Sequence, residues 1–293
     1  MATQEQIQKH SEIIDEVLDG FDDYMDSASK VLENRIAERI LETKTKDELL
    51  GLRVVINDDF EELISLKVRD YMKEFDKVAL DTTKMVGDGI TPLDNRVASE
   101  LKAQAYQSID ENVKTGRENV NSEIVIGAIA GMTVQAIAQN SRHAISGLFI
   151  QVDDVETTLL QKKIIRLSKK AKDLKTIALK KKLLVSLKQR FAGVNVGSSL
   201  NNTVKAGMHD KVMEFDAVFI KHRAEAAGLT NFKYTGSIIS GSRDFCIRNV
   251  GRTYTKTEAQ SKWANESWTG KKSGDPFVVR GGHNCRHFWV PVD

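Results

Sequence analysis

Cysteine, proline and aromatic residues are scarce in this sequence. The 293 residues include two cysteines and three prolines, and Phe, Trp and Tyr together make up 6%. Two cysteines do not make the dense disulfide framework of a small secreted protein. Because proline interrupts helices, its scarcity leaves room for long ones. The first twenty residues lack the apolar run of a signal peptide, so we expect a protein made inside the cell.

Aliphatic and charged residues, in contrast, are abundant. Hydrophobic residues make up 41% of the chain and charged residues 29%, a composition that allows packed cores. Ala, Leu, Lys and Glu, which favour helices, are all common. The net charge of +2 does not by itself indicate an acidic or a basic partner. The composition therefore predicts a mainly α-helical fold with long helices, packed as a bundle or extended as a helical body.

Residues 1–77 are acidic, with 20 Asp and Glu residues against 11 Lys and Arg residues, a net charge of −9. Apolar residues in this part step by 4, 3, 4 and 3 positions, the spacing of a seam between helices: Ile64, Val68, Tyr71, Phe75 and Val78. Two glycines around Asp88, followed by Pro92, end this pattern. We predict an antiparallel helical arrangement of residues 1–84 within an acidic helical domain of residues 1–94.

An apolar stretch at residues 124–141 carries no charged residue between Glu123 and Arg142. Its small residues include Gly127 and Gly131, whose spacing of four lets two helices approach closely. Two interpretations remain open: a buried helix packed through both glycines, or a segment that contacts a membrane. A spanning helix needs about 20 predominantly apolar residues, and this run contains Thr, Gln, Asn and Ser. The sequence therefore favours the buried helix.

A strongly basic stretch follows at residues 162–190, with 12 Lys and Arg residues and one acidic residue, Asp173. Apolar residues at helical spacing predict a basic helix over residues 159–191, within a helical segment of residues 95–192. Three interpretations remain open: the cations bind nucleic-acid phosphates, lie on an anionic membrane surface, or balance the acidic charge of residues 1–77. The predicted phosphate-binding residues are Lys162, Lys163, Arg166, Lys169, Lys170, Lys172, Lys175, Lys180, Lys181, Lys182, Lys188 and Arg190.

The last sixty residues collect the rarest residue types of the chain. Both cysteines, Cys246 and Cys285, lie here together with His283, His287 and all three tryptophans. Such a concentration indicates a module of fixed architecture. Cys285 lies between the two histidines at alternating positions, so these three side chains would share one face of a strand. Residues 289–292 have the apolar character of a final core strand.

Three short motifs follow one another in this part: Arg-x-Phe-Cys at 243–246, Gly-Arg-Thr-Tyr-Thr at 251–255 and Gly-Gly-His-Asn-Cys-Arg-His at 281–287. This succession resembles the C-terminal module of phage minor head proteins, or head morphogenesis proteins, of the Mu F-like type. The resemblance covers about the last sixty residues. It implies a small α+β module, which we place with its leading helix at residues 193–293. The family often has a second cysteine where this sequence has Asn249.

The cysteines and histidines allow several kinds of site. Thiolate and imidazole are good zinc ligands, so Cys246, His283, Cys285 and His287 are candidate ligands of a structural zinc ion. That Cys246 lies near the other three is implied only by the resemblance. A Cys246–Cys285 disulfide, which a reducing cytoplasm disfavours, and two buried thiols remain alternatives. Catalysis is least favoured, because a thiol and an imidazole two positions apart on a straight strand lie too far apart to share a proton.

The resemblance implies a structural virion protein that acts in head assembly and genome delivery. The expected partners are the portal and other head or ejection proteins, packaged double-stranded DNA, further copies of this chain, and a host membrane during ejection. The expected location is the virion, in the head interior or at the portal vertex, after synthesis in the host cytoplasm. The alternative is a metal-dependent nuclease or a delivered effector that uses the C-terminal Cys/His cluster.

Overall fold

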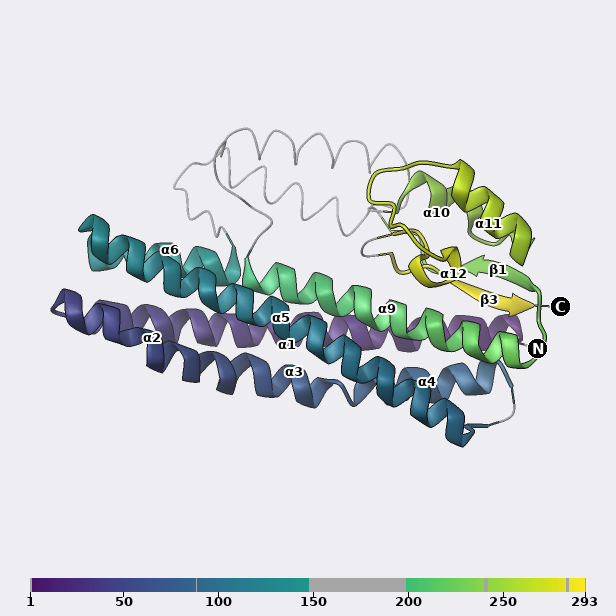
Figure 1. The fold of residues 1–293 in the computed structure, drawn as a ribbon, viewed down its shortest axis with the longest axis horizontal. Helices are drawn as coiled ribbons and strands as arrows, with labels where there is room; N and C mark the ends of the chain where they lie inside the picture. Colours follow the sequence, from purple (N-terminus) through teal and green to yellow (C-terminus); the bar gives the residue numbers. More distant parts are fainter. Residues whose placement is uncertain (1, 88, 148–198, 240–241, 283–284, 293) are drawn as a thin grey trace.

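Long helices lie side by side along one axis, and a small module with a three-stranded sheet packs against one end of them (Figure 1). The computed structural model describes residues 2–87, 89–147, 199–239, 242–282 and 285–292. The prediction of a mainly α-helical fold with a small α+β module at the C-terminus is confirmed. The predicted basic helix at residues 159–191 lies outside the described residues.

The first helix, α1 (Gln4–Glu42), runs the length of the bundle (Figure 1). Thr3 caps it by accepting a hydrogen bond from the Gln6 backbone N–H, and the Thr3 backbone N–H donates to the Gln6 side chain. The chain then reverses and returns along α1 as α2 (Lys46–Phe60), the π-helical turn η1 (Glu61–Ser65), α3 (Leu66–Tyr71) and α4 (Glu74–Met85). This return confirms the antiparallel arrangement predicted for residues 1–84.

Apolar residues at helical spacing hold α1 and the returning helices together. The buried stripe of α1 includes Ile7, Ile14, Leu18, Phe21, Met25, Leu32, Ile36 and Ile40. Four of the five predicted seam residues are also buried, and the fifth, Tyr71, is half-buried. The Tyr71 hydroxyl donates a hydrogen bond to the Val17 carbonyl at 2.6 Å, so this tyrosine keeps its polar end satisfied while its ring packs in the seam.

The next two helices form a second antiparallel pair. Helix α5 (Pro92–Ala130) follows the predicted break, with Thr91 as its cap and Pro92 in its first turn, where proline loses no helical hydrogen bond. It ends at Gly131, whose φ of 69° is left-handed and therefore favours glycine. Helix α6 (Val134–Ser146) then runs back along α5 (Figure 1).

The uncharged run at residues 124–141 is therefore two helix ends joined by a turn, and the prediction of one continuous buried helix is wrong. Gly127 does provide the expected close contact, because a Cβ at this position would lie 2.5 Å from Ile137 Cγ1. Gly131 packs against nothing and serves to end α5. Within the described ranges, no helix combines the length and the apolar character needed to cross a membrane.

Helix α9 (Leu200–Ala226) leads from the bundle into the C-terminal module and packs on both α1 and α5. Ser199 caps it by accepting a hydrogen bond from the Asn202 backbone N–H. The helix begins at Leu200 and ends at Ala226, just before Gly228.

The C-terminal module contains one small antiparallel sheet and three short helices. The central strand β1 (Asn231–Thr235) pairs with β2 (Thr253–Thr255) on one side and β3 (Phe288–Val292) on the other. The helices are α10 (Asp244–Asn249), α11 (Lys256–Asn265) and α12 (Pro276–Val279). The final strand agrees with the prediction for residues 289–292.

Strand β3 joins two hydrophobic cores. Phe288 and Val290 belong to the cluster that fills the bundle, whereas Trp289 belongs to a separate cluster inside the module. Successive strand residues point to opposite faces, so β3 forms a wall between the two cores. The bundle cluster includes residues from α1, α5 and α9. It therefore crosses the domain boundaries predicted at residues 94 and 192.

A buried charged triad lies where three helices meet β3. His10 of α1 is fully buried, with Nδ1 2.8 Å from Asp81 Oδ2 of α4 and Nε2 2.9 Å from Asp216 Oδ1 of α9. Its ring meets the Phe288 ring edge-on at 5.3 Å. Burial opposes a charge on His10, but the carboxylates of Asp216 and Asp81 outweigh burial and raise its pKa to about 9.

This shift predicts how stability depends on pH. Because the folded-state pKa of His10 lies above its ordinary value of 6.5, the protonated triad stabilises the fold below pH 6.5 and loses this contribution as pH rises through 9. The shift corresponds to roughly 3 kcal/mol of unfolding free energy. We expect urea unfolding of the wild type to lose about that much between pH 6 and 10, and His10→Gln to lose far less. His143→Gln in α6 should keep the wild-type profile, and a flat wild-type profile would contradict the assignment.

Candidate metal centre

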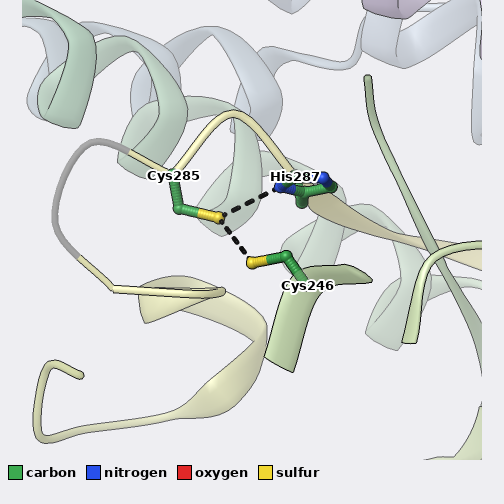
Figure 2. Close-up of side chains that lie close together, drawn as sticks. All are labelled: Cys246, Cys285 and His287. Carbon is green, nitrogen blue, oxygen red and sulfur yellow. Dashed lines mark hydrogen bonds between the residues drawn. The ribbon is translucent and has the colours of Figure 1, made fainter. Parts of the chain in front are cut away.

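Three side chains that can bind a metal lie together in the module. Cys246 projects from α10, Cys285 lies in the segment that enters β3, and His287 directly precedes β3 (Figure 2). Cys246 Sγ is 3.6 Å from Cys285 Sγ, and Cys285 Sγ is 3.5 Å from His287 Nδ1. All three residues are buried, and their ligand atoms lie within 4.8 Å of one another. The group is therefore compact enough to bind a metal ion.

The geometry corrects two expectations about this segment. The alternation of residues 283–287 predicted a strand, but β3 begins only at Phe288. Outside the strand, Cys285 Sγ lies 3.5 Å from His287 Nδ1, so the separation expected of these two groups on a straight strand does not apply. Cys246 does lie beside Cys285, as the resemblance implied. His283, the fourth predicted ligand, lies outside the described residues.

Two further residues enclose the sulfurs. Tyr234 of β1 places its Oη 3.4 Å from Cys246 Sγ and 3.6 Å from Cys285 Sγ. The Tyr234 ring stacks on the His287 ring, with centroids 5.6 Å apart. Gly281 packs against both sulfurs, because a Cβ at this position would lie 2.5 Å from each. The absence of a side chain at Gly281 is therefore what makes room for the two sulfurs side by side.

A buried arginine lies next to the cluster. Arg280 is 1% exposed and has a left-handed φ of 54°, which is uncommon outside glycine. Its Nη2 is 4.0 Å from Asp210 Oδ1, while its Nε and Nη1 have no hydrogen-bond partner in the part of the chain that the structure describes. Burial lowers the pKa of Arg280, whereas Cys285, Asp210 and Tyr234 favour its charged form. A buried guanidinium of this kind favours negative charge in the neighbouring cluster.

The two thiols consequently differ in acidity. The hydrogen bond from Cys246 lowers the pKa of the Cys285 thiol against the opposing effect of burial, and His287 and Arg280 lower it further. The hydrogen bond to Cys285, together with burial, raises the pKa of the Cys246 thiol. Burial raises the pKa of Tyr234 well above its usual range. Cys285 is therefore the first of the three to carry a negative charge.

The cluster lacks two features of a cysteine hydrolase. A nucleophilic cysteine needs a base that a third group orients, but no group among the described residues forms a hydrogen bond with His287 Nε2. Substrate access is the second requirement, and both Cys285 and His287 are almost completely buried. Nor is the pair of cysteines a disulfide in this structure, since both are free thiols. Within the described residues, the arrangement suits metal binding better than nucleophilic catalysis.

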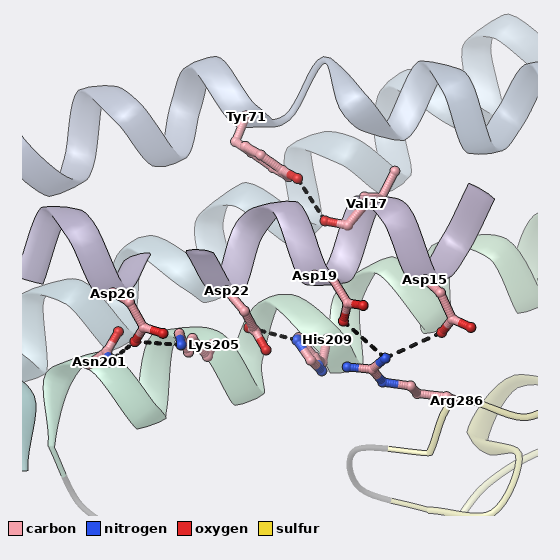
Figure 3. A network of polar contacts seen from close by, with 10 residues as sticks. All are labelled: Asp15, Val17, Asp19, Asp22, Asp26, Tyr71, Asn201, Lys205, His209 and Arg286. Atoms are coloured by element: carbon pink, nitrogen blue, oxygen red, sulfur yellow. Dashed lines mark hydrogen bonds and ion pairs between the residues drawn. The ribbon is translucent and has the colours of Figure 1, made fainter. Parts of the chain in front are cut away.

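Arg286, between the two candidate ligands of this segment, joins the module to the bundle. Its Nη1 is 3.3 Å from Asp15 Oδ1 and 3.2 Å from Asp19 Oδ1, both on α1 (Figure 3). The same face of α1 makes two further polar contacts with α9, a hydrogen bond between Asp22 and His209 at 2.8 Å and an ion pair between Asp26 and Lys205 at 2.6 Å. Part of the acidic charge of residues 1–77 is therefore paired within the described structure.

Comparison with protein-family models, with curated proteins and with solved structures gives no match for this chain. The predicted phosphate-binding residues between Lys162 and Arg190 all lie outside the described residues.

Sequence reasoning missed Tyr234 and Arg280 as members of this site. Tyr234 reaches the cluster because β1 pairs with β3, where it lies opposite Trp289, and no local motif indicates this pairing. Arg280 directly precedes the two glycines of the last motif. This position could have identified Arg280 as a site residue, because a residue beside a tight turn at a predicted site lies close to the ligands.

The packing at Gly281 can be tested by adding one methyl group. Gly281→Ala forces both sulfurs to move, so we expect a loss of about 1–3 kcal/mol in unfolding free energy and faster reaction of both thiols with a thiol reagent under native conditions. Gly251→Ala is the control, because its φ of 84° strains the backbone while its Cβ would meet nothing within 4 Å. Thiol reactivity that is unchanged in Gly281→Ala would show that the sulfurs do not pack there.

Proposed function

We propose that this chain is a structural protein of a tailed-phage particle, located at or near the portal vertex, that acts in head assembly and genome delivery. The observation that favours a structural over a catalytic role is the closed Cys/His centre, in which Cys246, Cys285 and His287 are 1%, 3% and 2% exposed. A structural metal site is closed, whereas a catalytic one keeps an open position. The location in a phage head rests on the resemblance of residues 243–287 to minor head proteins.

Zinc is the ion that these ligands suit best. Two thiolates and an imidazole are typical of structural zinc sites, and His287 Nδ1 is the nitrogen that faces the sulfurs. Cys246 and Cys285 are 39 positions apart in the sequence, so a shared ion would cross-link α10 to the segment before β3. Metal binding of this kind stabilises small domains whose core is limited.

Contact with DNA is the second part of the proposal. Residues 162–190 carry a net charge of +11, and such a segment binds phosphates without sequence preference and in a salt-dependent manner. The acidic face of α1 already pairs with Arg286 and α9, which favours phosphate binding over charge balance by these acids. Association with further copies of the chain and with a host membrane stays a prediction from the sequence.

The virion assignment is tested by mass spectrometry of particles purified from the virus that encodes this chain. We expect the protein in the particle at a constant ratio to the portal protein, after nuclease treatment and density-gradient purification. A non-structural protein of the same virus is the negative control and should be lost during purification. Detection of this chain only in extracts of infected cells would contradict the proposal.

The DNA contact is tested by charge reversal of Lys180, Lys181 and Lys182 to Glu. Binding to double-stranded DNA should weaken, and its log–log salt slope should flatten by about 0.9 for each lost phosphate contact, or about 2.7 for three. The matched control reverses Lys30, Lys44 and Lys46, three exposed lysines of the acidic part. An unchanged salt slope in the first variant, measured by fluorescence anisotropy over a salt series, would exclude this segment as the DNA-binding element.

A further inference from the structure

A fourth polar atom lies against the metal-binding group. Tyr234 Oη contacts Cys246 Sγ at 3.4 Å and Cys285 Sγ at 3.6 Å, the two sulfurs are 3.6 Å apart, and Cys285 Sγ is 3.5 Å from His287 Nδ1. In a tetrahedral zinc site with bonds of about 2.3 Å to sulfur and about 2.0 Å to nitrogen or oxygen, neighbouring ligand atoms lie about 3.5–3.8 Å apart. The four contacts therefore have close to the lengths of four of the six edges of such a tetrahedron, and the ligand atoms of Cys246 and His287, which form a fifth edge, lie within 4.8 Å of each other.

We propose that the Tyr234 hydroxyl oxygen is the fourth ligand of the metal centre, which then consists of Cys246, Cys285, His287 and Tyr234. This inference rests on the zinc site of the proposed function and adds the ligand that completes it. Tyr234 is fully buried, and the two sulfurs are the partners of its hydroxyl. Its ring is held in place by β1–β3 pairing and by stacking on His287, so the oxygen is positioned before any metal binds.

Charge balance gives an independent argument for this ligand. A zinc ion with two thiolates and a neutral imidazole has no net charge, whereas an added phenolate gives a net charge of −1. The buried guanidinium of Arg280 lies 4.0 Å from Asp210 and also interacts electrostatically with Cys285 and Tyr234. Among the described residues, its Nε and Nη1 have no hydrogen-bond partner. An anionic four-ligand centre adds to the compensation that Asp210 gives this buried positive charge, whereas a neutral three-ligand centre adds none.

The competing arrangement keeps the Tyr234 hydroxyl protonated, as a hydrogen-bond donor to metal-bound thiolates. Both arrangements give similar contacts and both lower metal affinity when the hydroxyl is removed, because groups behind the ligands also affect affinity by about 10–100-fold. The two arrangements differ in whether the Tyr234 hydroxyl keeps its proton when the metal binds. A tyrosine that becomes a ligand as phenolate releases its proton when the metal binds, whereas a hydrogen-bonding tyrosine retains it.

The test is a zinc titration of the full-length chain after removal of metal with a chelator. Calorimetry in buffers of different ionisation enthalpy counts the protons released, and near-ultraviolet difference absorption detects a tyrosinate. We expect the wild type to bind one zinc ion per chain, to release one proton more than Tyr234→Phe, and to show the tyrosinate band of a single residue. Tyr254→Phe is the matched control: Tyr254 lies in the same module and donates to Asn249 Oδ1, so its loss should leave both readouts unchanged.

The outcomes separate this inference from the zinc proposal. Zinc binding by the wild type without a tyrosinate band and with the same proton count as Tyr234→Phe would overturn the fourth ligand and leave the three-ligand centre. A wild type that binds no zinc would overturn both. If Tyr234→Phe does not fold, as judged by circular dichroism, the tyrosinate band of the wild type alone decides the question.

Discussion

The two-sided burial of β3 is the constraint on which the C-terminal half of this structure depends. Phe288 and Val290 fill the bundle core while Trp289 fills the module core, so β3 has no face left for solvent. The fully buried His10 meets Phe288 from the bundle side and adds a charged contact network beneath the strand. Because the metal-binding segment directly precedes β3, its position is fixed by hydrophobic packing whether or not an ion is present.

Local patterns predicted the helices better than they predicted the turns and the site. The seam around Val68 and the break before Pro92 were read correctly, because apolar spacing and proline act within a few residues. The prediction of one helix for the run at 124–141 was wrong. The lack of charge in this run does not indicate that Gly131 adopts a left-handed conformation and ends α5. Whether a glycine packs against a neighbour or ends a helix depends on the backbone angle, which composition does not report.

The candidate site shows the same division between local and long-range information. The spacing of Cys285 and His287 identified both as candidate ligands. The resemblance implied that Cys246 lies near them. Tyr234 lies at the site because β1 pairs with β3. Arg280 lies there because its backbone adopts a conformation that is rare outside glycine. The position of Tyr234 depends on tertiary structure, so no local motif could have placed it, whereas the two glycines after Arg280 were a local signal for that residue. The burial of the cluster residues then favours a closed, structural centre over a catalytic one.

Six consecutive positions before and within β3 contact four different neighbours. Cys285 and His287 face the metal centre, Arg286 pairs with α1, and the following residues alternate between the two cores. A deletion or insertion of one residue here would exchange every assignment at once: a cation would enter the sulfur cluster and a thiol would face the acids of α1. A single substitution in this segment therefore alters one contact, whereas a change in its length alters all of them.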